Sequence, residues 1–278
     1  MKNIVLLTGS ELRHQYVRRA LAANPNLRML TAFCEGAQQS LAARLSRAEE
    51  DNTEQQLYAA TREQTERDIF GLALKYMPEA SNPKFLEKGQ VNTPEVVNSI
   101  VCLNPDILCA YGCSLIKSEL LTRFEGRFIN LHLGLSPYFR GSGTNYFPLV
   151  QGRPEYVGAT FMFLDRGIDT GRIIHQIRAR IYHGDSAHLI GNRLIADAAE
   201  IYSRLVAEFD RVVDLPQPSS DIPFQLCLRK DFTLDSLRHL QHQFDTGMIE
   251  KYLNNENARC KEVPLIQQPW LTAQSKTT

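Results

Sequence analysis

Two short stretches of this chain combine residue types that stabilise developing charge and transfer protons. The apolar run 128–132 carries Asn130 and His132, which are two residues apart and therefore share one face of a strand. Farther along, a glycine-bracketed turn supplies Asp169. A histidine can give or take a proton near neutral pH, and a carboxylate beside it favours its charged form. Because an amide and an imidazolium form a donor pair for an oxyanion, these three residues favour acyl-type transfer.

Residues near these stretches admit two interpretations. Asp165 lies in the same turn as Asp169 and could compete with it, or could only cap the turn. Arg140, Gly141 and Ser142 belong to a glycine-rich loop that opens a short helix. The backbone amides and the arginine of this loop would suit an anionic or polar substrate, whereas the plainer interpretation is a flexible turn.

Other chemistries lack their sequence signatures. Gly9-Ser10 follows the first apolar run without the G-x-G-x-x-G spacing of a dinucleotide site, and we assign Ser10 to the substrate side. The loop at Arg140 lacks the Lys-Ser/Thr end of a P-loop. The six cysteines and the other histidines show no metal-ligand spacing, so we predict no metal site. Cys113 follows a strand end but has no partner histidine nearby in sequence, so we do not expect it to act as a nucleophile.

Alternating strand and helix patterns predict the scaffold that positions these residues. A strand, a helix and a strand over 4–8, 11–23 and 27–33 indicate a parallel unit. Further strands are expected over 106–110, 128–132, 157–164 and 224–228. Further helices are expected from caps at Thr93, Ser118 and Asp185, and over 234–253. Pro78 and Pro83 indicate a loop. We therefore predict an α/β fold, a Rossmann-like parallel sheet flanked by helices, with a small C-terminal extension.

Two regions are expected to lie outside this core. The segment from Gln38 to Asp68 is polar and helix-prone, so it either lies on the surface or covers the edge of a site, and its pattern favours the surface. A Pro- and Ser-rich stretch at 215–220 separates a catalytic domain, 1–212, from a linker and C-terminal extension, 213–278. That extension could make a homodimer contact, extend an acceptor pocket or cover the sheet.

The composition is that of an ordinary globular protein and argues against several partner classes. Of 278 residues, 43% are hydrophobic and 22% are charged. Lys and Arg total 31, as do Asp and Glu, so no net field favours nucleic acid or an anionic membrane. The first apolar run is too short for a signal peptide, and none is long enough to span a membrane. Without C-x-x-C spacing, these features predict a cytoplasmic protein with neither nucleic-acid nor membrane partners.

Together, these residues resemble the folate-dependent formyltransferase family, whose members act on glycinamide ribonucleotide, methionyl-tRNA or amino sugars. Asn130-Leu131-His132 matches the family's N-x-H strand, and residues 165–171 match its D-x-G-x-D-[TA]-G loop. The segment Ala110-Tyr111-Gly112 resembles the part of the family that lines the pterin pocket. The resemblance follows the order of elements from residue 1 to 212 and is sharpest from 110 to 171.

The resemblance implies 10-formyltetrahydrofolate as the formyl donor, and it implies roles for residues of this sequence. Asn130 would hydrogen-bond the formyl oxygen, and His132 would stabilise the charge of a tetrahedral intermediate or move its proton. Asp169 would keep His132 charged and help to remove the proton of the attacking amine. The donor would be held by Tyr111, Gly112, Cys113, Ser114, Leu115, Ile116, Ile168 and Asp169. The acceptor would face Ser10, Arg140, Gly141 and Ser142.

Departures from the family pattern concern the acceptor. Family members usually carry a serine two residues after the histidine and a Leu-Pro pair soon after, where this chain has Gly134 and Leu135-Ser136-Pro137. The chain also lacks room for the nucleic-acid-reading domain of the tRNA enzymes, and its charge is balanced. These features favour a small-molecule amine, and a nucleotide-linked amino sugar is the leading expectation by analogy.

Three other functions compete with this one. Hydrolysis of formyltetrahydrofolate would replace the amine by water, although that branch begins with an extra regulatory domain and here the first strand starts at Ile4. A binding or regulatory module would keep the fold without the chemistry, and the presence of Asn130, His132 and Asp169 together argues against it. A nicotinamide oxidoreductase on a similar fold would need the glycine spacing that is missing after Gly9.

Overall fold

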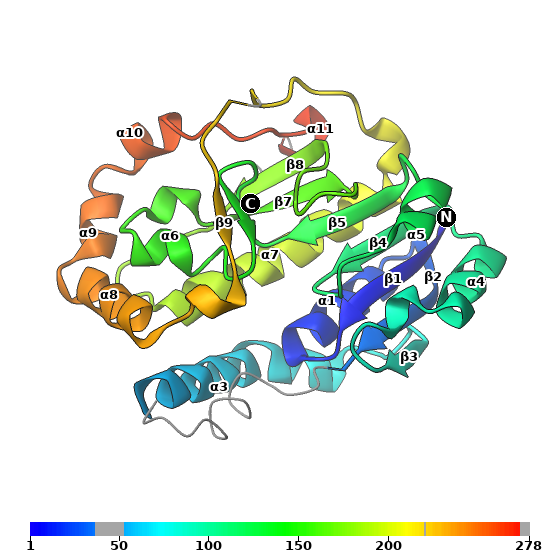
Figure 1. The fold of residues 1–278 in the computed structure, drawn as a ribbon, viewed down its shortest axis with the longest axis horizontal. Coiled ribbons are helices and arrows are strands. Elements are labelled where there is room, and N and C mark those ends of the chain that lie inside the picture. Colours follow the sequence, from blue (N-terminus) through cyan, green and yellow to red (C-terminus); the bar gives the residue numbers. More distant parts are fainter. Residues whose placement is uncertain (37–52, 220, 273–278) are drawn as a thin grey trace.

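The computed structural model of this chain describes residues 1–36, 53–219 and 221–272. A seven-stranded sheet with the order β3-β2-β1-β4-β5-β7-β8 runs through its centre (Figure 1). Its strands are β1 (Lys2–Gly9), β2 (Leu27–Glu35), β3 (Pro83–Leu86), β4 (Ile107–Tyr111), β5 (Phe128–His132), β7 (Gly158–Phe163) and β8 (Ile173–Arg178). Strands β1 to β5 are parallel, whereas β7 and β8 extend the sheet in antiparallel pairs.

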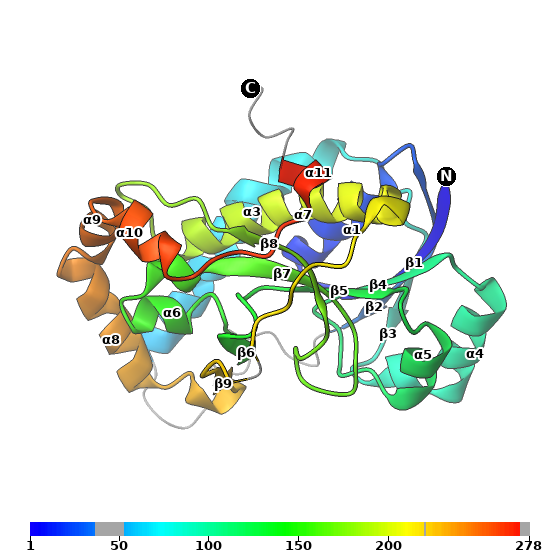
Figure 2. The same cartoon turned by 90° about the horizontal axis from the view of Figure 1, so that it is seen from above.

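Helices cover both faces of the sheet (Figure 2). One face carries α1 (Leu12–Ala22), α3 (Thr53–Tyr76) and α7 (Ala187–Ala207), which contact one another, and the other carries α4 (Pro94–Leu103) and α5 (Ser118–Arg123). Successive strand residues enter two separate apolar cores: Ile129 and Leu131 join the core under α1 and α7, whereas Phe128 joins the core under α4 and α5. The predicted fold, a Rossmann-like α/β sheet flanked by helices, is confirmed.

Local sequence explains most of these elements. The residues of β1 from Ile4 onward are all buried, as expected for a parallel strand covered on both faces. Helix α4 begins at Pro94, whose fixed φ suits the first turn, and it ends at Asn104, which adopts a left-handed φ of 41°. Thr93 occupies the cap position of α4 as predicted, but its hydroxyl makes no capping hydrogen bond.

Two strands of the seven-stranded sheet were not predicted. The expected loop at Pro83 is instead the start of β3, an edge strand paired with β2 alone, and a proline is tolerated at the first residue of such a strand. Strand β8 lacks clean alternation because His175 and Gln176 are buried within it. Both side chains form hydrogen bonds with the C-terminal extension, and these bonds offset the free-energy cost of burying them.

Two helix starts also differ from the prediction. The cap of α7 is Ser186, whose hydroxyl accepts a hydrogen bond of 3.3 Å from the N–H of Leu189. Asp185 instead accepts from the N–H of Tyr182 and pairs with Arg193. Helix α5 begins at Ser118 itself, with the preceding residue in the cap position.

The C-terminal extension packs against the rest of the protein. It contains β9 (Gln225–Cys227), α8 (Leu234–Asp245), α9 (Met248–Leu253), α10 (Glu256–Lys261) and α11 (Pro269–Thr272). Strand β9 pairs in parallel with β6 (Phe139–Gly141), and α8 contacts α6 (Phe147–Val150) and α3. After α10 the chain follows β8, where the N–H of Gln176 donates to the carbonyl of Ile266 at 2.7 Å. The extension therefore covers the edge of the sheet that β8 forms.

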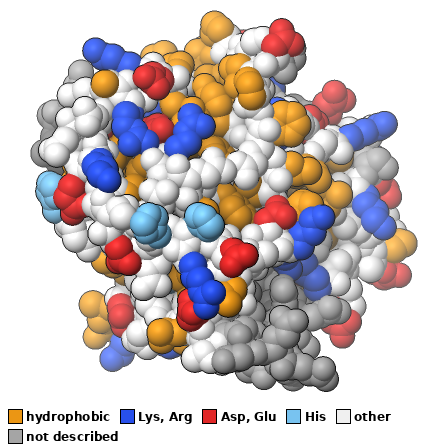
Figure 3. Space-filling view, turned by 60° about the vertical axis from the view of Figure 1, so that its left-hand side comes forward, with side chains coloured by type: hydrophobic (Ala, Val, Ile, Leu, Met, Phe, Trp, Pro, Cys, Tyr) orange, Lys and Arg blue, Asp and Glu red, His pale blue; other side chains and the backbone are white. Residues whose placement is uncertain are grey.

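The surface agrees with the balanced composition. On the side of the molecule drawn in Figure 3, acidic and basic side chains are interspersed rather than gathered by sign. Within the described ranges, none of the helices combines the length and apolar character that crossing a membrane requires.

Candidate active site

Strand β5 places the first two predicted site residues at the carboxyl edge of the parallel strands. Asn130 pairs with Ala110 of β4, and His132 is the last residue of β5. Ile129 and Leu131 enter the core under α1 and α7, so Asn130 and His132 take the opposite face, as their spacing predicts. Carboxyl ends of strands are where open α/β sheets bind ligands.

The loop after β7 brings Asp169 to His132. Asp169 Oδ2 lies 3.3 Å from His132 Nδ1, and the same oxygen accepts a hydrogen bond of 2.8 Å from the N–H of Gly141. Asp169 has a φ of 50°, in the left-handed region that aspartate tolerates better than most residues with a side chain. The backbone of the loop and a main-chain donor of β6 therefore fix the carboxylate against the imidazole.

The second ring nitrogen of His132 also faces an oxygen. His132 Nε2 lies 3.1 Å from the carbonyl of Phe139 in β6, and the side chain is only 6% exposed. A carboxylate and a carbonyl can only accept hydrogen bonds, so both nitrogens can donate only when the ring carries two protons. This arrangement suits an imidazolium.

A glycine makes room for the histidine. A Cβ atom added to Gly134 would lie 2.5 Å from His132 Nε2 and 2.7 Å from Thr144 Cβ. The Thr144 hydroxyl donates to the carbonyl of Leu133, so that side chain is itself held in place. Glycine stands at this position where the family usually has serine, and it leaves the space that His132 occupies when it contacts the Phe139 carbonyl.

The two carboxylates of the 165–171 turn have different surroundings. Asp165 is exposed, and its Oδ1 accepts hydrogen bonds from the N–H of Gly167 at 3.0 Å and from the Thr170 hydroxyl at 2.8 Å. These are the contacts of a turn cap. A Cβ on Gly171 would overlap the carbonyl of Phe163, so the turn requires glycine there. Asp165 therefore shapes the turn, and Asp169 faces the histidine.

The residues predicted to hold the donor lie on both faces of the sheet. Leu115 is 66% exposed and Ile168 is 44% exposed, so two large apolar side chains are open to solvent at the carboxyl edge. Ile116 is instead buried in the core under α4 and α5. Tyr111 points to the opposite face and is 2% exposed, in the core under α1 and α7.

A buried glutamate fixes the loop after β4. Glu35, at the end of β2, accepts hydrogen bonds of 2.7 Å from the N–H groups of Ser114 and Gly89. Gly112, with a φ of 67°, turns the chain out of β4 toward Cys113, whose thiol has a pKa that burial raises to about 12. Such a thiol stays protonated at neutral pH, in line with the expectation that Cys113 is no nucleophile.

The residues predicted to bind the acceptor are engaged within the protein. The guanidinium of Arg140 stacks 4.3 Å from the ring centre of Phe224, in the C-terminal extension. The N–H of Gly141 binds Asp169, and the N–H of Ser142 donates to the carbonyl of Cys227 at 2.8 Å. Arg140 and Gly141 belong to β6 rather than to a loop, because β9 pairs with them.

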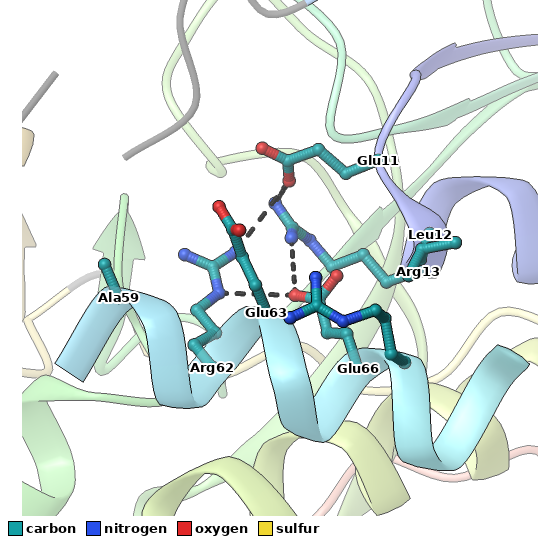
Figure 4. A pocket seen from close by; sticks show the side chains of 8 residues that line it. Glu11, Leu12, Arg13, Ala59, Arg62, Glu63 and Glu66 are labelled. Atoms are coloured by element: carbon teal, nitrogen blue, oxygen red, sulfur yellow. Dashed lines mark hydrogen bonds and ion pairs between the residues drawn. The ribbon is translucent and has the colours of Figure 1, made fainter. Parts of the chain in front are cut away.

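A charged pocket lies between the start of α1 and the middle of α3 (Figure 4). Residues 38–52 of the predicted polar segment lie outside the described residues, and α3 contains the rest of it. Helix α3 lies on the surface, as the pattern favours, since only Ala59, Glu66 and Phe70 of its 24 residues are buried. It also lines this pocket. The charged residues that line this α1–α3 pocket are Glu11, Arg13, Arg62, Glu63, Glu66 and Arg67.

Comparisons with known proteins assign the chain to a family. A sequence model described as formyl transferase matches residues 5–206. The chain belongs to this family. Its members use formyl-tetrahydrofolate. The methionyl-tRNA formyltransferase of Finegoldia magna is 26% identical over 149 residues, which are 50% of this chain and 47% of that protein. The chain thus spans about half the length of the curated relatives it matches.

Solved structures of other formyl transferases share the fold. A sugar N-formyltransferase from Shewanella superposes with a TM-score of 0.54 at 17% identity, over 86% of this chain and 87% of that one. Phosphoribosylglycinamide formyltransferase from Anaplasma phagocytophilum gives a TM-score of 0.54 at 16% identity, over 81% of this chain and 98% of that one.

Several features of this candidate site were missed by sequence reasoning. The carbonyl of Phe139 and the loop support from Glu35 depend on contacts between distant elements, for which the sequence carries no local signal. The α1–α3 pocket had one usable signal: Arg62 and Glu66 are four residues apart, the spacing of an ion pair on one helix face. Glu66 has a second partner, Arg13, which comes from another helix.

Proposed function

We propose that this protein transfers a formyl group from 10-formyltetrahydrofolate to the primary amine of a small molecule. The observation that carries the proposal is the 3.3 Å contact between Asp169 and His132, on the strand that also presents Asn130. Residues 1–212 form the catalytic domain in this proposal, and 213–278 form the extension. The reaction takes place in the cytoplasm, in line with six cysteines that are all unpaired.

Each of the three residues has a distinct task. The amide of Asn130 donates to the formyl oxygen, on which negative charge develops as the amine nitrogen adds to the formyl carbon. His132, with a proton on each nitrogen, places positive charge beside that oxygen. Asp169 keeps the ring charged and oriented, and it helps to carry off the proton that the amine loses. As the new amide bond forms, the bond between the formyl carbon and the folate nitrogen breaks, and that nitrogen takes up a proton in place of the one that the amine loses.

The donor fits the exposed apolar residues at the carboxyl edge. Leu115 and Ile168 would be covered by a flat ring system, and burial of apolar surface contributes roughly 25 cal/mol per Å². Backbone groups of the 112–115 segment would orient that ring system. The N–H of Ser114 is already bound to Glu35, so its part is to hold the loop rather than the donor.

A nucleotide-linked amino sugar is the acceptor that we propose. Support comes from the balanced charge and from the fold shared with the sugar N-formyltransferase from Shewanella. The curated relatives named methionyl-tRNA formyltransferase suggest an aminoacylated nucleic acid instead. Both acceptor classes therefore belong in the test.

The proposal is tested by following tetrahydrofolate release from 10-formyltetrahydrofolate. The panel contains nucleotide-linked amino sugars, amino acids, aminoribosyl compounds and methionyl-tRNA, with one reaction that lacks any amine. Release that depends on one small-molecule amine, with the formylated amine detected by mass, supports the proposal. Release with methionyl-tRNA alone overturns the acceptor class.

The same assay separates the competing functions. Release at an equal rate without amine identifies a hydrolase, in which water replaces the amine. Absence of release in every reaction, with the donor still bound in a calorimetric titration, identifies a non-catalytic binding module.

A further inference from the structure

The α1–α3 pocket contains charges of both signs in equal number. Three arginines and three glutamates line it, and ion pairs across the two helices join four of them, which are Glu11, Arg13, Arg62 and Glu66 (Figure 4). Arg13 Nη1 lies 2.7 Å from Glu66 Oε1, and Arg62 Nε lies 3.3 Å from the same oxygen. Glu11 pairs with Arg13 and lies 3.9 Å from Arg62. The lining therefore alternates hydrogen-bond donors with acceptors and has no net charge.

One face of α3 builds this side of the pocket. Tyr58, Arg62, Glu66 and Phe70 follow at intervals of four residues, so they share a helix face. At one end of the row, the Tyr58 ring lies 4.3 Å from the His188 ring, centre to centre. At the other end, Phe70 is fully buried. The two charged residues between them are thus held at fixed positions.

Two buried polar atoms near this pocket, on residues that do not line it, lack hydrogen-bond partners among the described residues. They are the Tyr111 hydroxyl and Nδ1 of His14, on side chains that are 2% and 6% exposed. Burial raises the pKa of Tyr111, and the charged residues that act on this pKa are lining residues of the pocket. A buried hydroxyl without a partner is costly, so a ligand group at this point would relieve a penalty.

Helix α1 connects the pocket to the end of β4, the strand beside the catalytic strand β5. The imidazole of His14 lies so close to Gly112 that a Cβ there would overlap it. Gly112 follows β4, whose Ala110 pairs with Asn130. Ile116, beside the donor residue Leu115, belongs to the core under α4 and α5, whereas Tyr111 belongs to the core under α1 and α7. The α1–α3 pocket is therefore on the face of the sheet that carries α1 and α7, and His14 of α1 reaches the carboxyl edge at Gly112.

We propose that the α1–α3 pocket binds the neutral, hydroxyl-bearing part of the acceptor, which rests on the proposed formyl transfer to an amino sugar. A hydroxyl group accepts from a guanidinium and donates to a carboxylate, so it fits between Arg62 and Glu66 without breaking their charge balance. A phosphate in the same place would meet the carboxylates of Glu11 and Glu66. The phosphates of a nucleotide-linked sugar therefore lie outside this pocket.

The sharpest test is Tyr111→Phe, which removes only the unpartnered hydroxyl. If the hydroxyl binds the acceptor, the KM for the best amine of the panel rises about five- to tenfold, the worth of one hydrogen bond, and the KM for 10-formyltetrahydrofolate is unchanged. If Tyr111 were purely structural, its replacement would leave both KM values unchanged. Thermal stability would then be equal or higher, because an unpaired buried group is removed. An unchanged acceptor KM would overturn the proposal.

A charge test uses Arg62→Met, with Lys75→Met on the same helix as the matched control. Arg62→Met should raise the acceptor KM by about tenfold or more, because a charged hydrogen bond is lost, whereas Lys75→Met, outside the pocket, should leave it unchanged. Equal effects of the two variants would assign the loss to net charge and overturn the proposal.

A binding measurement keeps this inference separate from the proposed function. N-acetylglucosamine and N-acetylglucosamine 6-phosphate are compared at equal millimolar concentration as stabilisers against heat. We expect the neutral sugar to protect the wild-type protein at least as well as the phosphate, and to protect Tyr111→Phe less. Stronger protection by the phosphate, abolished in Arg62→Met, would assign an anion to the pocket and overturn the proposal. Protection without turnover on any amine would refute the proposed function alone.

Discussion

The two sides of the carboxyl edge hold their polar residues by different means. On the side of the catalytic residues, His132 and Asp169 are fixed by main-chain groups of β6 and by a left-handed φ in the loop after β7. On the other side, the α1–α3 pocket is held by side-chain ion pairs, in which Glu66 joins Arg13 of one helix to Arg62 of its own.

This difference separates chemistry from selectivity. Main-chain donors and acceptors persist when side chains are exchanged, so the geometry of His132 and Asp169 tolerates change elsewhere. Ion pairs between two helices can be altered one residue at a time, and each alteration changes which polar group fits between them. Substitutions on the catalytic side should therefore lower kcat, and substitutions in the α1–α3 pocket should raise the acceptor KM.

The largest expected effect is that of His132→Ala. Loss of the charged ring should lower kcat by about 10²- to 10⁴-fold, because a positioned acid–base group contributes that much. Tetrahydrofolate release measures kcat, and thermal unfolding checks the fold. The control is His239→Ala, at an exposed position of α8, which should leave both unchanged. A His132→Ala protein with a raised acceptor KM and an unchanged kcat would contradict the assignment of the chemical step to this side of the edge.

Asp169→Asn isolates the charge of the carboxylate. Asparagine tolerates a positive φ and keeps an oxygen for the N–H of Gly141, so the loop should retain its shape. We expect kcat to fall roughly 10- to 100-fold while donor affinity stays within about twofold. The matched control is Asp165→Asn in the same turn, which should affect stability more than kcat. Equal losses of kcat and donor affinity would mean that Asp169 only shapes the pocket.

Acid should lower the stability of the protein through His188, whose ring packs against Tyr58 of α3. Burial, followed by the nearby charge of Arg62, lowers the pKa of His188 to about 4. Between pH 6.5 and pH 4 the unfolded chain binds a proton that the folded chain does not, so stability falls as the pH drops through this window and is unaffected above it. The loss is on the order of 1–2 kcal/mol after allowance for partial exposure.

Unfolding by urea at pH 7 and pH 4.5 measures this loss. His188→Gln should flatten the pH dependence by the same amount. Some dependence will persist, because burial also lowers the pKa of His175 to about 4. Should His188→Gln leave the slope between the two pH values untouched, the assignment to His188 is wrong.

The smallest effect is expected for Leu115→Ala on the donor side. Leu115 is two-thirds exposed, so its truncation should leave thermal stability unchanged. Removal of apolar surface that the donor covers should raise the donor KM about three- to tenfold and leave the acceptor KM alone. Phe85→Ala, at another exposed apolar residue, serves as the control. An unchanged donor KM would remove Leu115 from the donor site.

Sequence reasoning succeeded where the information is local. The boundaries of β5 and the shared face of Asn130 and His132 follow from five residues of alternating pattern. The turn around Asp169 is encoded by its glycines, and the family resemblance drew on the same short segments. The sequence left the choice between Asp165 and Asp169 as turn cap open, and the hydrogen bonds of the structure separate the two.

The failures concern contacts between distant parts of the chain. Strand β8 was overlooked because the hydrogen-bond partners of His175 and Gln176 lie in distant segments. Both side chains accept from the C-terminal extension, and Gln176 also donates to Ser136 and Thr160. The burial of Glu66 on α3 was also missed, because glutamate counts as polar in any pattern and its charge is balanced by Arg13 from another helix. A charge that is neutralised by a partner far along the chain carries no signature in its own segment.

The pairing of β6 with β9 has a consequence for biosynthesis. Strand β6 provides the carbonyl that His132 contacts and the N–H that Asp169 contacts, yet its own partner strand is translated much later. Nascent chains that contain the whole seven-stranded sheet but not β9 should therefore be folded and inactive. Arrested chains of increasing length should gain protease resistance first and turnover only after β9 has emerged. That order would keep an unfinished enzyme from consuming its donor on the ribosome.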